Sequence, residues 1–165
     1  SREFTLKNSI REIKDNYDYV LIDCMPSLGM ITINALACSD KIIIPVQGEY
    51  LAAKGMGHLL KTVNRVHKQI NPNLKIGGVL LTLVDKRTNL SKDVRDTINE
   101  NYGHYVNIYN TEIPKAINTA KSTSTGKSIF EFDKNSPVAE AYKNLAKEVL
   151  DNERTRTKNE TSKAR

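Results

Sequence analysis

The hydrophobic positions of this chain alternate between helical spacing and short continuous apolar runs. Apolar residues recur three and four positions apart in several stretches, which predicts helices at residues 6–13, 31–37, 52–70, 94–98 and 138–150. Continuous apolar runs predict strands at residues 19–22, 42–44 and 76–84, with residues 106–109 as a weaker candidate. Pro45 is expected to close its strand, and Ser136 with Pro137 to start the last helix as N-cap and first residue.

The strands are rich in Ile, Val and Leu and show little polar alternation. This composition is typical of a parallel sheet buried on both faces, with helices as crossovers between the strands. We therefore predict an α/β fold, doubly wound, with a mainly parallel sheet and helices on both faces. Ligands of such sheets bind beyond the carboxyl ends of the strands. Candidate site residues are consequently expected in 23–29, 47–50 and 85–89.

Composition narrows the class of protein. The 165 residues, 39% hydrophobic and 27% charged, suit one globular domain, which we place at residues 1–150. No apolar run could span a bilayer, and Cys24 and Cys38 lack metal-ligand or disulfide-framework spacing, so a reducing cytoplasm is expected. Residues 151–165 carry five basic and three acidic side chains and no large aliphatic one, which predicts a disordered basic tail. The net charge of +6 permits attraction to nucleic acid.

Several motifs resemble those of one family. The segment DYVLIDCMPSLG at residues 18–29, followed by INAL at 33–36, resembles the Walker B block of ParA/Soj/MinD-type partition ATPases. IPVQGEYLAAKG at residues 44–55 and GVLLTLVDKRTNL at residues 78–90 are similar to later segments of that family, in the same order. The resemblance extends from about residue 10 to 150 and implies a fold of the P-loop NTPase type.

The resemblance assigns roles around a nucleotide. A carboxylate at a strand's carboxyl end can hold the hydration shell of Mg²⁺ beside the phosphates, and the family implies this metal-binding and catalytic role for Asp23. An ordinary turn-starting aspartate is the alternative. Pro26 and Gly29 would shape the loop that senses the γ-phosphate, although turn chemistry also explains them. Gln47 would lie near the nucleotide or the dimer face, or simply in a helix-entry loop.

Two further sets of residues follow from the same resemblance. The resemblance implies that Thr82, Asp85 and Pro114 lie close to the adenine base, whereas Thr82 could also be simply a strand residue. Arg87 matches a position that the family uses for non-specific DNA binding by the ATP-bound dimer, whereas a lone surface arginine is more often only solvated. A second basic residue of the family falls here on Asn118, and Lys115 and Lys121 supply charge nearby, which phosphate contacts require more than exact geometry.

The sequence also lacks an expected motif. Partition ATPases bind phosphates with a glycine-rich loop after their first strand, and none occurs here; Gly126-Lys127-Ser128 imitates its end but has Lys121 where glycine is required. We therefore expect the C-terminal two-thirds of such an ATPase, without the first strand and the P-loop. Such a chain would expose an apolar sheet edge and bind ATP weakly or not at all alone, which leaves its status as an enzyme open.

Three functions remain as hypotheses. The first is an ATPase, or a fragment of one, that partitions plasmid, chromosome or mobile-element DNA. It would use ATP and Mg²⁺, act as a homodimer on non-specific DNA at the nucleoid, and work with a ParB-like centromere-binding protein, away from membranes. The second is a non-catalytic module that binds DNA or a partner. The third, a dehydrogenase, needs a G-x-G-x-x-G turn after a strand, which Gly55-Met56-Gly57 within a helix does not provide.

Overall fold

The computed structural model describes residues 2–25, 27–47, 50–85 and 87–163. Helices and strands alternate along them, as the hydrophobic pattern predicts. The elements, in chain order, are η1 (Arg2–Phe4), α1 (Thr5–Arg11), η2 (Lys14–Asn16), α2 (Met30–Cys38), β1 (Lys41–Gln47), α3 (Tyr50–Gln69), β2 (Lys75–Thr82), α4 (Leu90–Tyr102), α5 (Ile117–Ser124), α6 (Ile129–Phe132) and α7 (Pro137–Lys163). Among the described residues, no helix is both long and apolar enough to cross a membrane.

The chain divides into two compact units. Unit 1 comprises Ser1–Ile42 and Lys54–Ile76, and unit 2 comprises Ile43–Ala53 and Gly77–Arg165. Both strands pass from one unit into the other.

The two strands pair in parallel. The N–H of Lys75 donates to the carbonyl of Asp40 at the beginning of both strands, 2.9 Å away. The hydroxyl of Thr82 donates to the carbonyl of Val46 near their ends, at 3.4 Å. The two strands therefore start side by side and end side by side, which makes them parallel. The helix α3 is the crossover that a parallel pair requires.

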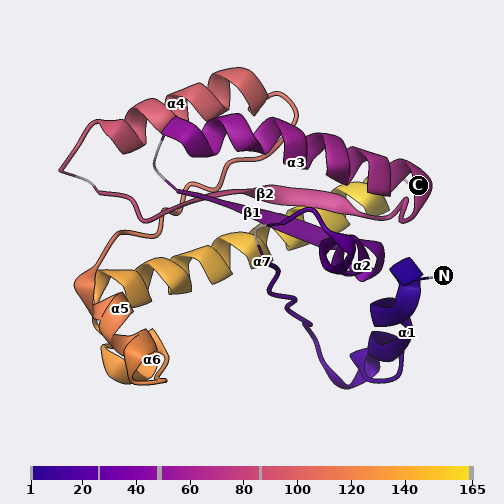
Figure 1. Ribbon diagram of the computed structural model, residues 1–165, viewed down its shortest axis with the longest axis horizontal. Coiled ribbons are helices and arrows are strands. Elements are labelled where there is room, and N and C mark those ends of the chain that lie inside the picture. Colours follow the sequence, from indigo (N-terminus) through magenta and orange to yellow (C-terminus); the bar gives the residue numbers. More distant parts are fainter. Residues whose placement is uncertain (1, 26, 48–49, 86, 164–165) are drawn as a thin grey trace. The chain divides into compact units, whose positions relative to one another are not determined.

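Within unit 2, helices cover both faces of β2 (Figure 1). Leu80 packs in a cluster with side chains of α6 and α7, among them Ile129, Val138 and Ala139. Val79 and Leu81 are fully buried, and they face away from that cluster because successive strand residues point to opposite sides. In unit 2, α4 lies on one side of β2 and α7 on the other, so the predicted α/β arrangement with helices on both faces is confirmed.

Unit 1 has its own core between α2 and α3. Its buried members are Leu36, Val63, Val66 and Leu74. Asn71 is buried beside them, and its amide donates to the carbonyls of Leu36 and Ser39 at 2.9 and 2.8 Å. It thereby satisfies carbonyls at the end of α2 that no helical N–H reaches.

The start of the last helix follows its prediction, and its far end does not. The Ser136 hydroxyl accepts from the N–H of Ala139 at 3.2 Å, which makes Ser136 the N-cap before Pro137. At the other end, α7 continues to Lys163, where residues 151–165 were expected to be disordered. That expectation weighed the lack of apolar residues, whereas Glu, Arg and Lys are strong helix formers that extend a helix already begun.

Two strand predictions need correction. Residues 19–22 form no strand, because among the described residues no neighbouring strand pairs with them. Pro45 lies within β1 instead of closing it. A proline is tolerated in an edge strand where its nitrogen faces away from the paired neighbour, and within the described part of the chain β1 pairs only with β2.

Candidate functional site

The Walker B-like segment lies in unit 1, between η2 and α2. Its backbone is irregular, and Asp23 is exposed. The hydroxyl of Thr32 in α2 donates to the carbonyl of Ser27, which ties the loop to the first turn of the helix. Gly29 is the N-cap of α2 and accepts from Ile33. Pro26, expected in the γ-phosphate loop, lies outside the described residues. The structure thus places Asp23 one loop away from the amino end of a helix, which favours anions.

The donor chemistry at Asp23 fits the expected magnesium ion only as an outer ligand. Mg²⁺ keeps several waters and takes one or two carboxylates together with phosphate oxygens. The exposed carboxylate of Asp23 offers such oxygens. No group of three or more His, Cys, Asp or Glu side chains within the described residues could hold a metal by itself. Asp23 would therefore hold the ion together with a nucleotide, not as part of an all-protein cage.

A second group of predicted residues gathers in unit 2, beyond the end of β2. Residues 113–115 run beside it, with Ile113 N–H donating to Leu81 at 2.9 Å and Val84 N–H donating to Ile113 at 3.1 Å. Val84 and Pro114 form a parallel bridge. Thr82 is joined to β1 through the Val46 carbonyl, next to the exposed Gln47. Residues from three adjacent segments thus meet at the carboxyl edge of the sheet, where α/β folds bind ligands.

The backbone turns sharply where β2 ends. Leu83 has a φ of 53°, the one non-glycine residue with a positive φ in the described chain. This left-handed conformation is uncommon for a side chain branched beyond Cβ, and such outliers gather at functional sites. The turn lies between Thr82 and the bridge at Val84, so it sets the direction in which Asp85 leaves the sheet.

Asp85 and Arg87 form an ion pair in the following turn. Arg87 Nε donates to Asp85 Oδ1 at 3.0 Å and Nη2 to Oδ2 at 2.8 Å, while the Arg87 N–H also donates to Oδ1 at 3.0 Å. These bonds, together with the charges of Arg87 and Lys115, lower the pKa of Asp85 to about 2. Lys115 is exposed, and its N–H donates to the Val84 carbonyl at 3.0 Å.

The third predicted DNA-binding cation, Lys121, lies on another element of unit 2. Lys121 is exposed on α5. The structure therefore brings Thr82, Asp85, Pro114 and two of the predicted cations, Arg87 and Lys115, into one region of unit 2. Asp23 and Gly29 belong to unit 1.

Comparisons with known proteins cover both groups. Residues 1–76 match the family described as AAA domain. The sporulation initiation inhibitor protein Soj of Bacillus subtilis is 47% identical over 152 residues, 92% of this chain and 59% of Soj. The chromosome partitioning protein ParA of Caulobacter vibrioides is 37% identical over 157 residues, 94% of this chain and 58% of ParA. The chain belongs to the ParA/Soj family of partition ATPases. It spans about three-fifths of the length of these relatives.

A solved structure extends the likeness to the fold. Cobyrinic acid a,c-diamide synthase from Mycobacterium smegmatis matches with a TM-score of 0.76 and 33% identity, over 91% of this chain and 54% of the synthase. A second structure of that synthase, with bound ADP and magnesium, matches over 70% of this chain and 46% of the synthase, with a TM-score of 0.66 and 38% identity. The fold of this ParA/Soj family member is therefore that of the P-loop NTPases.

Three charged residues position the site without having been predicted from the sequence. Arg95 of α4 donates to Glu112 at 2.9 Å and to the Tyr109 carbonyl at 3.0 Å. Glu148 of α7 accepts from the N–H groups of Asn110 and Thr111 at 2.7 and 2.9 Å. Burial alone would raise the pKa of Glu148, but the hydrogen bonds from Asn110 and Thr111, together with the charge of Arg95, outweigh it and the pKa is lowered. Together they hold residues 109–112, which lead into Pro114 and Lys115.

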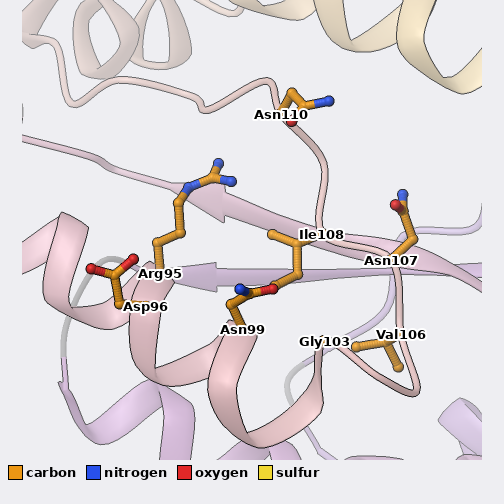
Figure 2. Close-up of a pocket in the computed structure, with 8 residues that line it drawn as sticks. All are labelled: Arg95, Asp96, Asn99, Gly103, Val106, Asn107, Ile108 and Asn110. Carbon is orange, nitrogen blue, oxygen red and sulfur yellow. The ribbon is translucent and has the colours of Figure 1, made fainter.

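The same region of this family member contains a pocket of about 330 Å³ between α4 and residues 103–110 (Figure 2). Its walls are mostly polar, with asparagine side chains from both segments. The Arg95 side chain that lines it is already paired with Glu112 and Tyr109. No periodicity or motif in the sequence predicts this pocket, because its lining combines one helix face with an irregular segment.

Proposed function

We propose that this protein acts as a ParA/Soj-type ATPase in the ATP-dependent partition of plasmid, chromosome or mobile-element DNA. In this proposal it works in the cytoplasm as a homodimer on non-specific DNA, with a ParB-like centromere-binding partner. Family membership supports the class of function. The observation that carries the proposal is the meeting of Thr82, Asp85 and Pro114 on adjacent parallel segments at the carboxyl edge of the sheet.

Nucleotide-binding roles are proposed for residues of each unit separately. Thr82, Asp85 and Pro114 are proposed to contact the base, with Gln47 near the nucleotide or the dimer face. Asp23 is proposed to hold Mg²⁺ through water beside the phosphates, with Pro26 and Gly29 in the loop that senses the γ-phosphate. The synthase structure with ADP and magnesium supports ATP and Mg²⁺ as the ligands. Magnesium would neutralise phosphate charge, which is the chemistry that this ion supplies in phosphoryl transfer.

Titration of a fluorescent ATP analogue with Mg²⁺ into the chain tests the nucleotide proposal. Asp23→Ala should abolish the Mg²⁺-dependent part of binding, whereas Asp15→Ala, an exposed aspartate of η2, should leave it intact. Equal binding by wild type and Asp23→Ala would remove Asp23 from the metal site. If the wild-type chain does not bind the analogue, this stretch of the protein is not a nucleotide-binding unit alone.

The DNA-facing residues are proposed to be Arg87, Lys115 and Lys121. All three are exposed, and phosphate contacts supply most of non-specific affinity. Arg87→Ala should weaken binding to random-sequence duplex and reduce the salt dependence of the dissociation constant. Arg65→Ala is the matched control, because Arg65 is an exposed arginine on α3. If both variants weaken DNA binding equally, the binding depends on the net charge of the protein and not on Arg87 in particular.

A second candidate function is a non-catalytic DNA-binding module. The exposure of Arg87, 90% of its side chain, together with a net charge of +6, favours it. DNA binding that depends on Arg87 but is unchanged by the ATP analogue and Mg²⁺ would support this module. DNA binding that strengthens when nucleotide is added would support the ATPase.

A further inference from the structure

The hydrogen bonds of Arg87 occupy the edge of its guanidinium that would meet a phosphate. Nε and Nη2 form a fork that lies on both oxygens of Asp85, at 3.0 and 2.8 Å. Arginine binds carboxylate and phosphate with this same bidentate geometry. An oxyanion of DNA must therefore displace Asp85 before it can form the paired contact.

The backbone of the turn keeps Asp85 in that position. Thr88 donates from both its N–H and its hydroxyl to the Asp85 carbonyl, each at 3.2 Å. The Arg87 N–H is bonded to the same carboxylate oxygen as Nε. The two partners of the ion pair are only two positions apart in the chain. After the pair opens, it can therefore form again without any rearrangement elsewhere in the protein.

The pair is stable enough to form and weak enough to open. Arg87 is 90% exposed and Asp85 30% exposed, and exposed ion pairs contribute little free energy because water screens them. The hydrogen bonds from Arg87, with a smaller contribution from the charge of Lys115, lower the pKa of Asp85 and keep its carboxylate charged well below neutral pH. A dense row of phosphates can consequently compete for Arg87, whereas an isolated anion has little advantage over Asp85.

We infer that Asp85 is an internal competitor for the phosphate-binding edge of Arg87 and thereby sets the affinity of this surface for the backbone of duplex DNA. The inference rests on the proposed role of Arg87. It gives Asp85 a function in DNA affinity that is separate from contact with a nucleotide base.

Binding of a labelled random-sequence duplex to the full chain, followed by fluorescence anisotropy at several salt concentrations, tests the inference. Asp85→Asn keeps the size of the side chain and removes its charge, and it should tighten binding about two- to fivefold at low salt, the range of one exposed ion pair. The gain should shrink as salt rises. Asp93→Asn, an exposed aspartate in the first turn of α4, removes the same charge elsewhere in unit 2 and should have a smaller effect.

The double variant Asp85→Asn/Arg87→Ala separates competition from general charge. If Asp85 acts through Arg87, removing its charge in the Arg87→Ala background should change the affinity no more than Asp93→Asn does. The full two- to fivefold gain without Arg87 would overturn the inference. Circular dichroism and the melting temperature of each variant should match wild type, because both side chains lie at the surface.

The remaining outcomes distinguish the inference from the proposed function. If Arg87→Ala leaves DNA affinity unchanged, the role of Arg87 is wrong, and the inference fails with it. If Arg87→Ala weakens binding but Asp85→Asn does not strengthen it, the role of Arg87 stands and only the inference fails. If wild type binds no DNA, binding gained by Asp85→Asn and lost in the double variant would support the inference, and no gain would overturn it.

Discussion

Two apolar runs of this chain have similar composition but differ in secondary structure and in exposure to solvent. Residues 79–81 of β2 are almost completely buried, with Val79 and Leu81 at 0% exposure. Residues 19–22 form no strand, and Leu21 is 92% exposed. Both runs were predicted as strands from the same signal. An apolar run therefore becomes a strand only where neighbours supply its hydrogen bonds and helices cover its faces.

The surroundings of β2 supply both conditions. Val79 exchanges hydrogen bonds with Asn107 and Tyr109 at 2.8 and 2.9 Å, and β1 pairs on the other side. The residue before it shows how closely the chains approach, because a Cβ on Gly78 would lie 2.7 Å from the Tyr109 ring. Residues 19–22 have no such ladder among the described residues.

The largest expected effect comes from truncating one leucine in each run. Leu81→Ala should lower the free energy of unfolding by about 3 kcal/mol, since it removes buried contacts and leaves a cavity. Leu21→Ala should change it by less than about 0.5 kcal/mol, since surface substitutions rarely do more. Urea unfolding measures both. Comparable losses would mean that residues 19–22 are packed as tightly as β2, and the contrast would disappear.

Adding a methyl group tests the close approach beside β2. Gly78→Ala should destabilise unit 2 by about 1–3 kcal/mol, because the buried Tyr109 ring and the Asn107 carbonyl cannot move aside without strain. Gly55→Ala is the matched control: nothing lies within 4 Å of its added Cβ in α3. It should raise the melting temperature slightly, as alanine favours helix by up to about 1 kcal/mol over glycine. A stabilising Gly78→Ala would contradict the packing described.

The carboxylate that holds residues 109–112 gives a pH-dependent effect. The pKa of Glu148 is lowered in the folded protein, so its stabilisation is fully present above the ordinary glutamate pKa of about 4.3 and is lost as pH falls through the lower folded value. Glu148→Gln should cost about 1 kcal/mol at neutral pH, because each N–H donates to a different carboxylate oxygen and the amide has only one oxygen to accept.

The pH dependence separates that interaction from general charge. In Glu148→Gln, the decrease in stability below pH ~4.3 should be smaller than in wild type. Glu100→Gln, an exposed residue of α4, should keep the wild-type pH profile. A Glu148→Gln profile that runs parallel to wild type would show that Glu148 does not bond to Asn110 and Thr111 in solution.

The smallest effect concerns the turn after β2. Carboxyl-carbon NMR should give a pKa for Asp85 of about 2, and Arg87→Ala should return it toward the ordinary value of about 3.9. The stabilisation from this pair is present above the ordinary value and lost as pH falls through about 2. Global stability should barely change, because the pair is exposed. An unchanged Asp85 pKa in Arg87→Ala would show that the pair does not form.

Prediction from sequence succeeded where the signal is local. Helical spacing predicted α1, α2, α3, α4 and α7, and the pair Ser136-Pro137 marked where α7 begins. The motifs around Asp23 and Arg87 indicated the ParA/Soj family, which the relatives confirm. The roles assigned to individual residues stay predictions.

The order and type of most elements follow from the amino-acid sequence, because helix periodicity, caps and motifs depend on residues a few positions apart. Which apolar run became a strand depended on folding, since pairing needs a partner distant in the chain. The tertiary structure also determined that Glu148 and Arg95 hold residues 109–112, and that Asp85 pairs with the guanidinium of Arg87. These interactions depend on where the charged side chains point after folding, and hydrophobic spacing along the chain does not predict those directions.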